Sequence, residues 1–203
     1  MIKALITDFG GVLMRTRTDG SRHALEQRLG LPPHMIENVV FSSDLSQRAQ
    51  HGEMRETAFW QQVECDLDLS RHALPLDEFR NRFFEEDFLD EELMNFIRGT
   101  RPAVKTGLIS NAWDGLREVL HTRVPIAEAF DVLMISAEEK IMKPDARIYQ
   151  RTLERLGVNA AEAIFLDDVL PNIHAADALG MQGVHFRSTA QAQRDIRTLL
   201  DEP

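Results

Sequence analysis

Short apolar runs that alternate with stretches of helical periodicity constrain the fold of this chain more than any other feature. Each run is almost continuously apolar, which is typical of strands that are covered on both faces. The runs lie at residues 2–7, 103–110, 130–136 and 162–167, with a weaker one at 183–187. Strand–helix alternation of this kind predicts an α/β fold, with a Rossmann-like parallel sheet and helices on both of its faces.

The helices expected between and after these runs have recognisable ends. One is predicted over residues 144–156, with Pro144 as its first residue and Gly157 as its C-terminal stop. The others are expected at 113–121, at 171–179, closed by Gly180, and at 189–200.

Residues 16–98 interrupt this rhythm, because they contain no convincing strand. Amphipathic helical patterns are expected there at 21–29, 33–41, 55–65, 75–85 and 90–98. Apolar side chains at helical spacing predict a small bundle core made of Phe59, Trp60, Val63, Phe79, Phe83 and Phe84. The sequence therefore predicts two units: an α/β core domain of residues 1–15 and 99–203, and an inserted small α-helical domain of residues 16–98.

The charge balance narrows the range of partners. The chain has 23 basic and 33 acidic residues among 203, a formal net charge of −10. Nucleic acids and anionic membranes attract the opposite sign, so we expect neither as a partner. The single cysteine, Cys65, cannot form an internal disulfide, and no apolar run approaches the roughly 18 residues of a membrane span. These features predict a soluble, cytoplasmic protein. The acidic run at 85–92 is expected to be a solvated helix junction.

Polar residues stand at the carboxyl ends of several predicted strands. They are Asp8 after the first run, Ser110 and Asn111 at the second, and Asp167 and Asp168 at the fourth. Lys143 precedes the helix that follows the third run. Because open parallel sheets bind ligands at the carboxyl ends of their strands, we expect these side chains to converge on one crevice.

The chemistry of this set fits a phosphate site. Neighbouring carboxylates repel one another unless a cation is present, and hard oxygen ligands suit Mg²⁺. Mg²⁺, a lysine and helix N-terminal amides together form a site for a dianion such as phosphate. A carboxylate left over is a candidate nucleophile, because aspartate can form an acyl-phosphate intermediate.

Four segments carry a more specific resemblance: ITDFGGVL (6–13), LISNAW (108–113), KIMKPDARIY (140–149) and IFLDDVLPNI (164–173). In this order they resemble the four motifs of the haloacid dehalogenase superfamily of hydrolases, and the insert stands where that family carries its helical type 1 cap. The chain is most similar to small phosphatases such as the phosphatase domain of soluble epoxide hydrolase and the sugar-1-phosphate phosphatases. The resemblance implies a Mg²⁺-dependent phosphomonoesterase that acts on a small phosphorylated metabolite through an aspartyl-phosphate.

The resemblance also implies roles for the residues that match its motifs. Asp8 would be the nucleophile and a Mg²⁺ ligand. Lys143 would pair with the nucleophile and with the phosphate. Ser110 and Asn111 would hold phosphoryl oxygens.

The implied metal ligands show one departure from the family pattern. Asp168 would ligate Mg²⁺ directly, Asp167 would support it directly or through a neighbouring ligand, and Asn172 would brace that loop. Gly10 would contribute its backbone carbonyl, but most phosphatases of the family carry there an Asp that serves as general acid and base. This chain therefore lacks the usual proton donor, whose contribution is typically about 10²- to 10⁴-fold.

A replacement for the proton donor is expected, if one exists, in the insert. The candidates are His51, Glu53 and His23, and the alternative for each is an exposed surface side chain. Arg15 and Arg17, just after the nucleophile loop, either meet a second anionic group or are solvated.

Two other functions remain open. The 2-haloacid dehalogenases also lack the second Asp, since halide leaves without a proton, but they need no metal, and the Asp167–Asp168 pair favours one. Gly10 alone motivates the third possibility, a catalytically weak binding or regulatory protein. The sequence predicts neither the identity of the substrate nor the oligomeric state.

Overall fold

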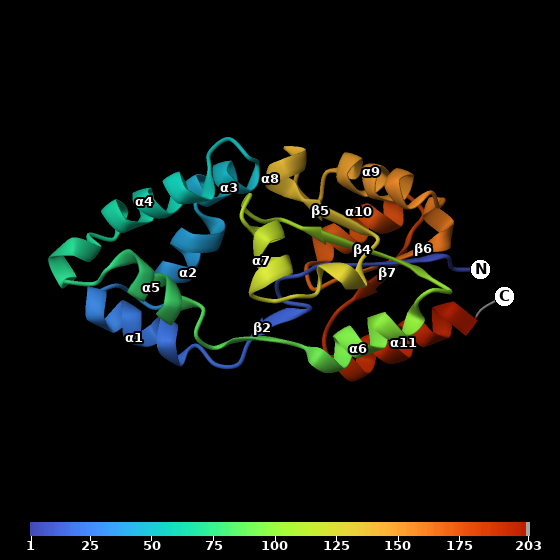
Figure 1. The fold of residues 1–203 in the computed structure, drawn as a ribbon, viewed down its shortest axis with the longest axis horizontal. Coiled ribbons are helices and arrows are strands. Elements are labelled where there is room, and N and C mark those ends of the chain that lie inside the picture. Colours follow the sequence, from blue (N-terminus) through green and yellow to red (C-terminus); the bar gives the residue numbers. More distant parts are fainter. Residues whose placement is uncertain (202–203) are drawn as a thin grey trace.

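The computed structural model describes residues 1–201 and contains a five-stranded sheet in the order β5-β4-β1-β6-β7 (Figure 1). Every neighbouring pair of these strands is parallel. The strands are β1 (Ala4–Thr7), β4 (Lys105–Ser110), β5 (Val132–Ile135), β6 (Ala163–Asp167) and β7 (Gln182–His185). Each one lies within a predicted apolar run, apart from the first residue of β7, so the predicted parallel α/β sheet is confirmed.

The helices of the sheet domain alternate with these strands. They are α6 (Glu91–Thr100), α7 (Leu116–Thr122), α8 (Ser136–Glu139), α9 (Ala146–Leu156), α10 (Leu170–Ala178) and α11 (Thr189–Asp201), with 3₁₀ turns at Ala127–Ala129 and Ala160–Glu162. The predicted end of α9 is confirmed, because Gly157 adopts the left-handed conformation that closes a helix (φ 64°). The predicted start at Pro144 is wrong. Asp145 caps the helix instead, accepting a hydrogen bond from the Arg147 amide (2.9 Å).

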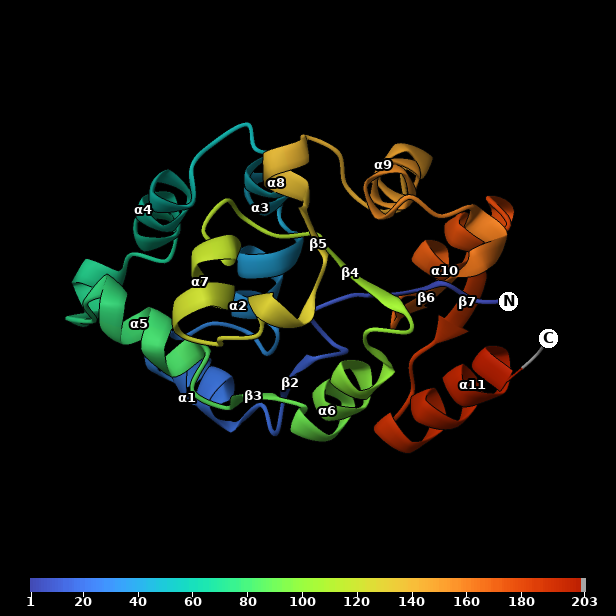
Figure 2. The same cartoon turned by 45° about the vertical axis from the view of Figure 1, so that its right-hand side comes forward.

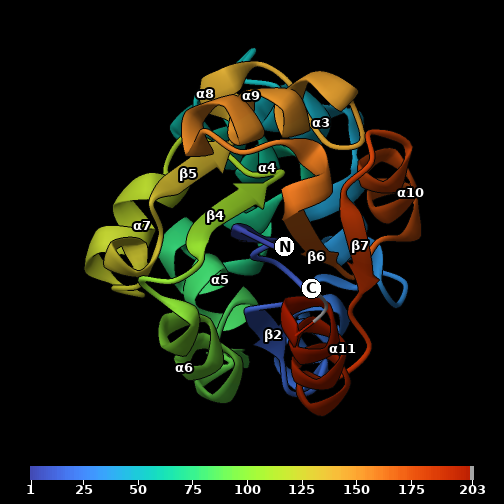
Figure 3. The same ribbon diagram turned by 90° about the vertical axis from the view of Figure 1, so that its right-hand side faces the viewer.

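Helices cover both faces of the sheet, as predicted. Figure 3 shows α9 above the strands and α10 at their right, next to β7, with α6 and α11 below. Alternate side chains of β1 and β6 enter different hydrophobic clusters: Leu5 and Ile164 belong to one, and Ile6 and Phe165 to the other. Because both faces are buried, the strands need the nearly continuous apolar sequence that identified them. No helix within residues 1–201 has the length and apolar character needed to cross a membrane.

The insert is helical and has its own core. Its elements are α1 (Gly20–Leu29), α2 (Met35–Glu37), the π-helical turn η1 (Asn38–Ser42), α3 (Asp44–Gln50), α4 (Glu56–Asp66), the 3₁₀ turn η2 (Leu69–His72) and α5 (Leu76–Phe83). The predicted core residues Phe59, Trp60, Val63, Phe79 and Phe83 are buried in one cluster, with Phe84 partly buried against it. The predicted bundle core is thus confirmed. Helix α3 was not predicted; the Ser43 hydroxyl caps it by accepting a hydrogen bond from the Ser46 amide (3.1 Å).

A two-stranded antiparallel ribbon carries the chain between the sheet domain and the insert. It consists of β2 (Met14–Thr16) and β3 (Asp87–Leu89). The expectation that residues 16–98 contain no strand is therefore wrong at β3. Three residues are too few to show an alternating pattern, so this strand depends on its partner rather than on a local signal.

The acidic run at 85–92 is the predicted solvated junction only in part: Glu85, Glu91 and Glu92 are exposed, but Asp87 and Asp90 are paired. Asp87 pairs with Arg22 of the insert (2.9 Å), and Asp90, only 5% exposed, pairs with Arg15 (2.7 Å). Asp90 also caps α6 by accepting a hydrogen bond from the Leu93 amide (3.0 Å). These contacts tie the ribbon to both domains. They also occupy Arg15, one of the two arginines considered for a second anionic group.

Helix α6 packs with the sheet domain rather than with the insert. Its residues Leu93, Met94 and Ile97 are buried in the hydrophobic cluster that also contains Leu5 of β1. None of these three residues belongs to the apolar cluster of the insert. The predicted boundary at residue 98 falls inside this helix. We propose that the β2–β3 ribbon separates the two domains.

The carboxyl ends of the strands face the insert, and the N-terminus lies at the opposite end of the molecule (Figures 1 and 2). Trp113, in the loop after β4, packs into the cluster of the insert, with its ring centroid 5.0 Å from that of Phe59. Ser136, directly after β5, donates a hydrogen bond to the Gln50 carbonyl of α3 (2.7 Å). The insert therefore covers the edge of the sheet where ligands are expected.

Candidate active site

Strand β1 lies at the switch point of the sheet. It pairs with β4 on one side and with β6 on the other, so the sheet extends in both directions from it. The crevice beyond the carboxyl ends at such a point is the usual ligand site of open parallel sheets. Asp8 is the first residue after β1, and its amide donates to the Leu166 carbonyl (2.8 Å), next to Asp167 at the end of β6. The fold thus brings these two predicted site residues together.

Lys143 lies between the two carboxylates. Its Nζ is 2.7 Å from Asp8 Oδ1 and 2.7 Å from Asp167 Oδ2, and the residue is only 4% exposed. Burial alone would lower the pKa of Lys143, but the charges of Asp8 and Asp167 and their hydrogen bonds raise it above its ordinary value. A buried ammonium of this kind persists because both partners compensate its charge.

Asn111 holds the backbone of Lys143 in place. Its Oδ1 accepts a hydrogen bond from the Lys143 amide (2.8 Å), and its Nδ2 donates to the Lys143 carbonyl (2.9 Å). The resemblance implied that Asn111 would hold phosphoryl oxygens. We propose instead that it positions Lys143, because the side-chain amide is engaged at both ends. Ser110, the last residue of β4 and 4% exposed, remains the candidate for a phosphoryl oxygen.

Asp167 is completely buried and every contact of its carboxylate lies within the site. Besides Lys143, its oxygens accept hydrogen bonds from the Val169 amide (2.8 Å) and from Asn172 Nδ2 (3.1 Å to each oxygen). Asn172 therefore braces the turn after β6, in the geometry that the resemblance implied. These bonds fix the turn that carries the next residue, Asp168.

Asp168 is exposed at the mouth of the site and lies against Gly11. A Cβ atom on Gly11 would overlap the Asp168 carboxylate, and Gly11 has a φ of 77°, a conformation that favours glycine. Burial and the neighbouring Asp167 charge raise the pKa of Asp168. Gly11 was missed by the sequence analysis; the Gly-Gly pair after Phe9 was the available signal.

The three carboxylates form a group that fits a divalent cation. One oxygen each from Asp8, Asp167 and Asp168 lies within 4.8 Å of the other two. Burial raises the pKa of Asp8 to about 7, Lys143 opposes this rise and Asp167 adds to it. One lysine against three carboxylates leaves the group with excess negative charge, and hard oxygen donors of this kind suit Mg²⁺.

Residue 10, where most phosphatases of the family carry the general acid, has free space around it. Gly10 is exposed, and no atom lies within 4 Å of the place where its Cβ would stand. Its φ lies outside the range that favours glycine, unlike that of Gly11. A side chain at residue 10 is therefore compatible with this loop.

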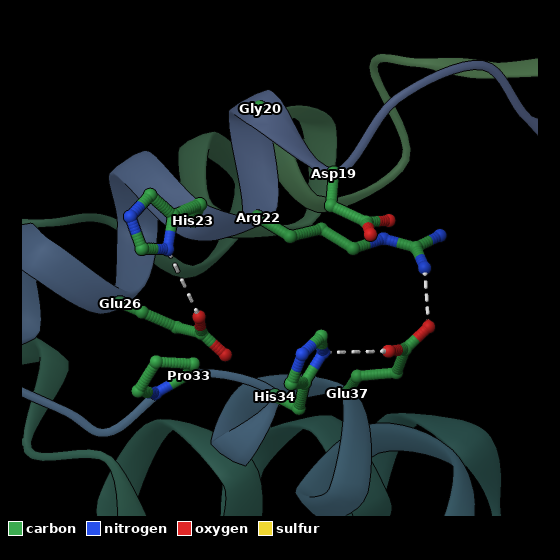
Figure 4. A pocket seen from close by; sticks show the side chains of 8 residues that line it. All are labelled: Asp19, Gly20, Arg22, His23, Glu26, Pro33, His34 and Glu37. Carbon is green, nitrogen blue, oxygen red and sulfur yellow. Dashed lines mark hydrogen bonds and ion pairs between the residues drawn. The ribbon is translucent and has the colours of Figure 1, made fainter.

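Within residues 1–201, none of the three proton donors considered in the insert forms a hydrogen bond or ion pair with the carboxylates of the site. His23 lines a cavity of about 420 Å³ between α1 and α2, where it faces Glu26 (3.7 Å) and where no catalytic carboxylate is found (Figure 4). His51 is exposed, and Glu53 pairs with Arg48 (3.3 Å). The turn between them packs at Gly52 against Ala137, just after β5, two strands away from β1. That one of these three residues donates the proton therefore stays a prediction.

Comparison with known proteins gives a consistent result. The family model of haloacid dehalogenase-like hydrolases matches residues 2–180. The chain is 27% identical to a sesquiterpene phosphatase of Aspergillus oryzae, over 98% of this chain and 96% of that protein. It is 25% identical to a D-ribitol-5-phosphate phosphatase of Bacteroides thetaiotaomicron, over 99% of this chain and all of that protein.

A solved structure has the same fold. It is an enzyme of the haloacid dehalogenase family from Bacteroides thetaiotaomicron, in complex with magnesium and inorganic phosphate. It is 18% identical to this chain, with a TM-score of 0.71. The match covers 92% of this chain and 95% of that one.

Proposed function

This chain belongs to the haloacid dehalogenase-like hydrolase family, and we propose that it is a Mg²⁺-dependent phosphomonoesterase that works through an aspartyl-phosphate. The observation that carries the proposal is the buried Lys143 ammonium between Asp8 and Asp167, with Asp168 beside them. The site combines a carboxylate nucleophile with positive charge for a phosphoryl group. Phosphatases among its relatives support small phosphorylated molecules as the substrate class.

The residues that would hold the cation are Asp8, Asp168 and the backbone carbonyl of Gly10, with Asp167 in support. When bound, Mg²⁺ would neutralise charge on the phosphoryl oxygens. The solved neighbour that contains magnesium and phosphate supports this assignment through its fold.

In the proposed reaction, the Asp8 carboxylate forms a bond to phosphorus while the bond from phosphorus to the leaving oxygen breaks. Water then attacks the phosphorus of the acyl-phosphate, and Asp8 is released together with inorganic phosphate. The contacts that the Asp8 carboxylate makes within residues 1–201, from Lys143 Nζ and from the Phe9 amide (2.7 Å each), both involve Oδ1. Oδ2 is therefore the oxygen left for substrate or cation. The Lys143 ammonium stabilises the charge that develops on the phosphoryl group.

A panel of phosphate monoesters and 2-haloacids, each assayed with Mg²⁺ and with a chelator, tests this function. We expect phosphate release with Mg²⁺, none with the chelator, and recovery when Mg²⁺ is added back. Halide release in the presence of the chelator would overturn the proposal in favour of a dehalogenase. A folded protein that releases neither product would support a binding or regulatory role.

Gly10 leads to a prediction about leaving groups. Without a positioned acid, the leaving oxygen departs with more negative charge, so the rate should depend steeply on its pKa. Aryl phosphates such as p-nitrophenyl phosphate, and anomeric sugar phosphates, should therefore be faster than primary alkyl phosphates such as glycerol 3-phosphate. The measurement is kcat/KM against leaving-group pKa. A flat dependence would show that another group donates the proton, and His51→Ala or Glu53→Gln would then identify it.

Replacing Gly10 with aspartate should restore a general acid. The open space around the Gly10 Cβ position means that the loop accepts the new side chain. We expect Gly10→Asp to raise the alkyl rates by up to about 10²-fold while changing the aryl rates little, which flattens the dependence. Gly10→Asn, of the same size but without an ionisable proton, is the matched control. Equal gains in both variants would contradict the acid–base interpretation.

A further inference from the structure

Large apolar side chains remain exposed in the insert and directly after Asp168. Within residues 1–201 the exposed ones are Met1, Met35, Phe41, Val169 and Leu170. Apart from the terminal Met1, they fall in two short segments: α2 with η1 in the insert, and the turn after Asp168 in the sheet domain. Scattered exposed hydrophobics need no explanation, but a group of them at a ligand site does.

Phe41 packs on one side against Phe83 of the insert (centroids 5.4 Å apart) and also contacts the loop after β4. Its ring stacks on Trp113, with centroids 6.1 Å apart and planes 8° apart, and the Arg22 guanidinium lies 5.8 Å from the ring centroid. Trp113 follows Asn111 by two residues. Arg22 donates to Thr16 (3.0 Å), in the strand that continues from the Asp8 loop.

The Phe41 ring thus contacts Trp113 in the loop after β4 directly and is linked to β2 through Arg22, and it is still 39% exposed. Its backbone is fixed as well, because Gln50 Nε2 donates to the Phe41 carbonyl (3.0 Å) and the Gln50 carbonyl is bound to Ser136 of the sheet domain. Figures 1 and 2 show α2, which leads into η1, on the side of the insert that faces the sheet.

Val169 and Leu170 lie in the sheet domain, joined directly to Asp168. They are 44% and 47% exposed. The hydrogen bond from the Val169 amide to Asp167 Oδ1 (2.8 Å) fixes them relative to the carboxylates, and Leu170 begins α10. The Val169–Leu170 pair is therefore anchored to a site carboxylate, and Phe41 is anchored to the loop that follows Ser110 and Asn111.

We propose that the substrate carries an apolar leaving group, a hydrocarbon chain or ring rather than a polyol, which is bound between Phe41 and the Val169–Leu170 pair. This inference rests on the proposed phosphatase function and adds the substrate class to it. A sugar or polyol placed against these side chains would lose hydrogen bonds to water without gaining partners. A hydrocarbon placed there gains free energy in proportion to the apolar area removed from water. The named substrates of the relatives include both classes and leave the choice to the structure.

The first test uses 4-alkylphenyl phosphates with methyl, propyl and pentyl groups, assayed with Mg²⁺. Their phenols have nearly equal pKa values, so the series varies apolar area alone. We expect kcat/KM to rise roughly two- to fourfold for each added methylene that is buried. Pentyl phosphate and ribitol 5-phosphate form a second matched pair, since both are five-carbon primary esters. We expect a higher kcat/KM for pentyl phosphate.

Two serine variants test whether each apolar side chain causes the chain-length dependence. Phe41→Ser and Leu170→Ser should each flatten this dependence, whereas the conservative variant Phe41→Leu should keep most of it. Phe96→Ser is the control: this half-buried ring lies on α6, where Arg197 covers it (5.1 Å), and its loss should leave the dependence steep. Thermal unfolding of each variant reports whether it is folded. If Phe41→Ser fails to fold, Leu170→Ser still decides, because that side chain is nearly half exposed.

Three results would overturn the inference while leaving the phosphatase function intact. They are a flat chain-length series in the unmodified protein, a steep series that survives in both folded serine variants, and a higher kcat/KM for ribitol 5-phosphate than for pentyl phosphate. Failure of every phosphate ester, including p-nitrophenyl phosphate with Mg²⁺, would instead contradict the proposed function itself.

Discussion

Replacing Asp8 with asparagine is expected to lower the rate of phosphate release by about 10⁴-fold or more, the scale seen when a hydrolase loses its covalent nucleophile. An amide oxygen is a poor nucleophile and cannot form the acyl-phosphate. The measurement is kcat on p-nitrophenyl phosphate with Mg²⁺. Asp195→Asn, a change of the same kind at a partly exposed position on α11, should leave kcat unchanged.

The same variant should remain folded, because asparagine keeps the hydrogen-bonding shape of the site. Its carbonyl can accept from the Phe9 amide and from Lys143, which bind Asp8 Oδ1 in the unmodified protein (2.7 Å each). Burial raises the pKa of Asp8 to about 7, so the ionised carboxylate is destabilised where it stands and a neutral amide is not. We therefore expect a Tm no lower than that of the unmodified protein in chelator. Near-normal turnover in the folded variant would disprove the nucleophile assignment.

The architecture was predictable because burial on two faces leaves a strong local signal. Strands β1 and β6 are buried at every position, so their sequences are apolar up to a last polar residue, Thr7 or Asp167, and stand out from the helices around them. Strand β3 gave no such signal, since its three residues are only partly buried and its partner β2 is about 70 residues away in the chain. Local pattern therefore predicts the sheet domain better than it predicts the ribbon.

The main residues of the site were predictable for a topological reason. Parallel strands place their carboxyl ends at one edge, so Asp8 and Asp167 were expected at the same edge, and they are neighbours because β1 pairs with β6. Lys143 was also expected in this crevice, and the structure agrees: its Nζ lies 2.7 Å from a carboxylate oxygen of Asp8 and 2.7 Å from one of Asp167.

The supporting contacts were not predictable, because each depends on two distant segments. Asn111 binds the backbone of Lys143, 32 residues further along, and no local pattern distinguishes this from contact with a ligand. The overlap that a Cβ on Gly11 would make with Asp168 likewise appears only when both loops are in place. Trp113 was expected to begin a helix, yet it packs into the core of the insert, which links the loop after β4 to Phe41.

Replacing Lys143 with methionine is expected to lower kcat by roughly 10²-fold or more, as happens when an electrostatic donor to a transition state is removed. It should also destabilise the protein by about 3–5 kcal/mol, the usual result of removing one partner of a buried ion pair. Asp8 and Asp167 would then face each other without the ammonium that now lies 2.7 Å from each. Lys140→Met, at an exposed position three residues earlier, is the matched control and should change neither quantity.

The destabilisation by Lys143→Met should also depend on pH in a defined direction when measured in chelator. Lys143 lowers the pKa of Asp8 in the folded protein, so its removal moves that pKa further above about 7, while the unfolded value stays near 3.8. A carboxyl whose pKa is raised by folding stabilises the folded state when protonated, and that stability is lost as the pH rises toward the folded-state pKa. The gap in Tm between the variant and the unmodified protein should therefore be smaller at pH 5 than at pH 8. A gap that is constant or shrinks with rising pH would show that Lys143 does not compensate the Asp8 charge, and the electrostatic account of the site would fail with it.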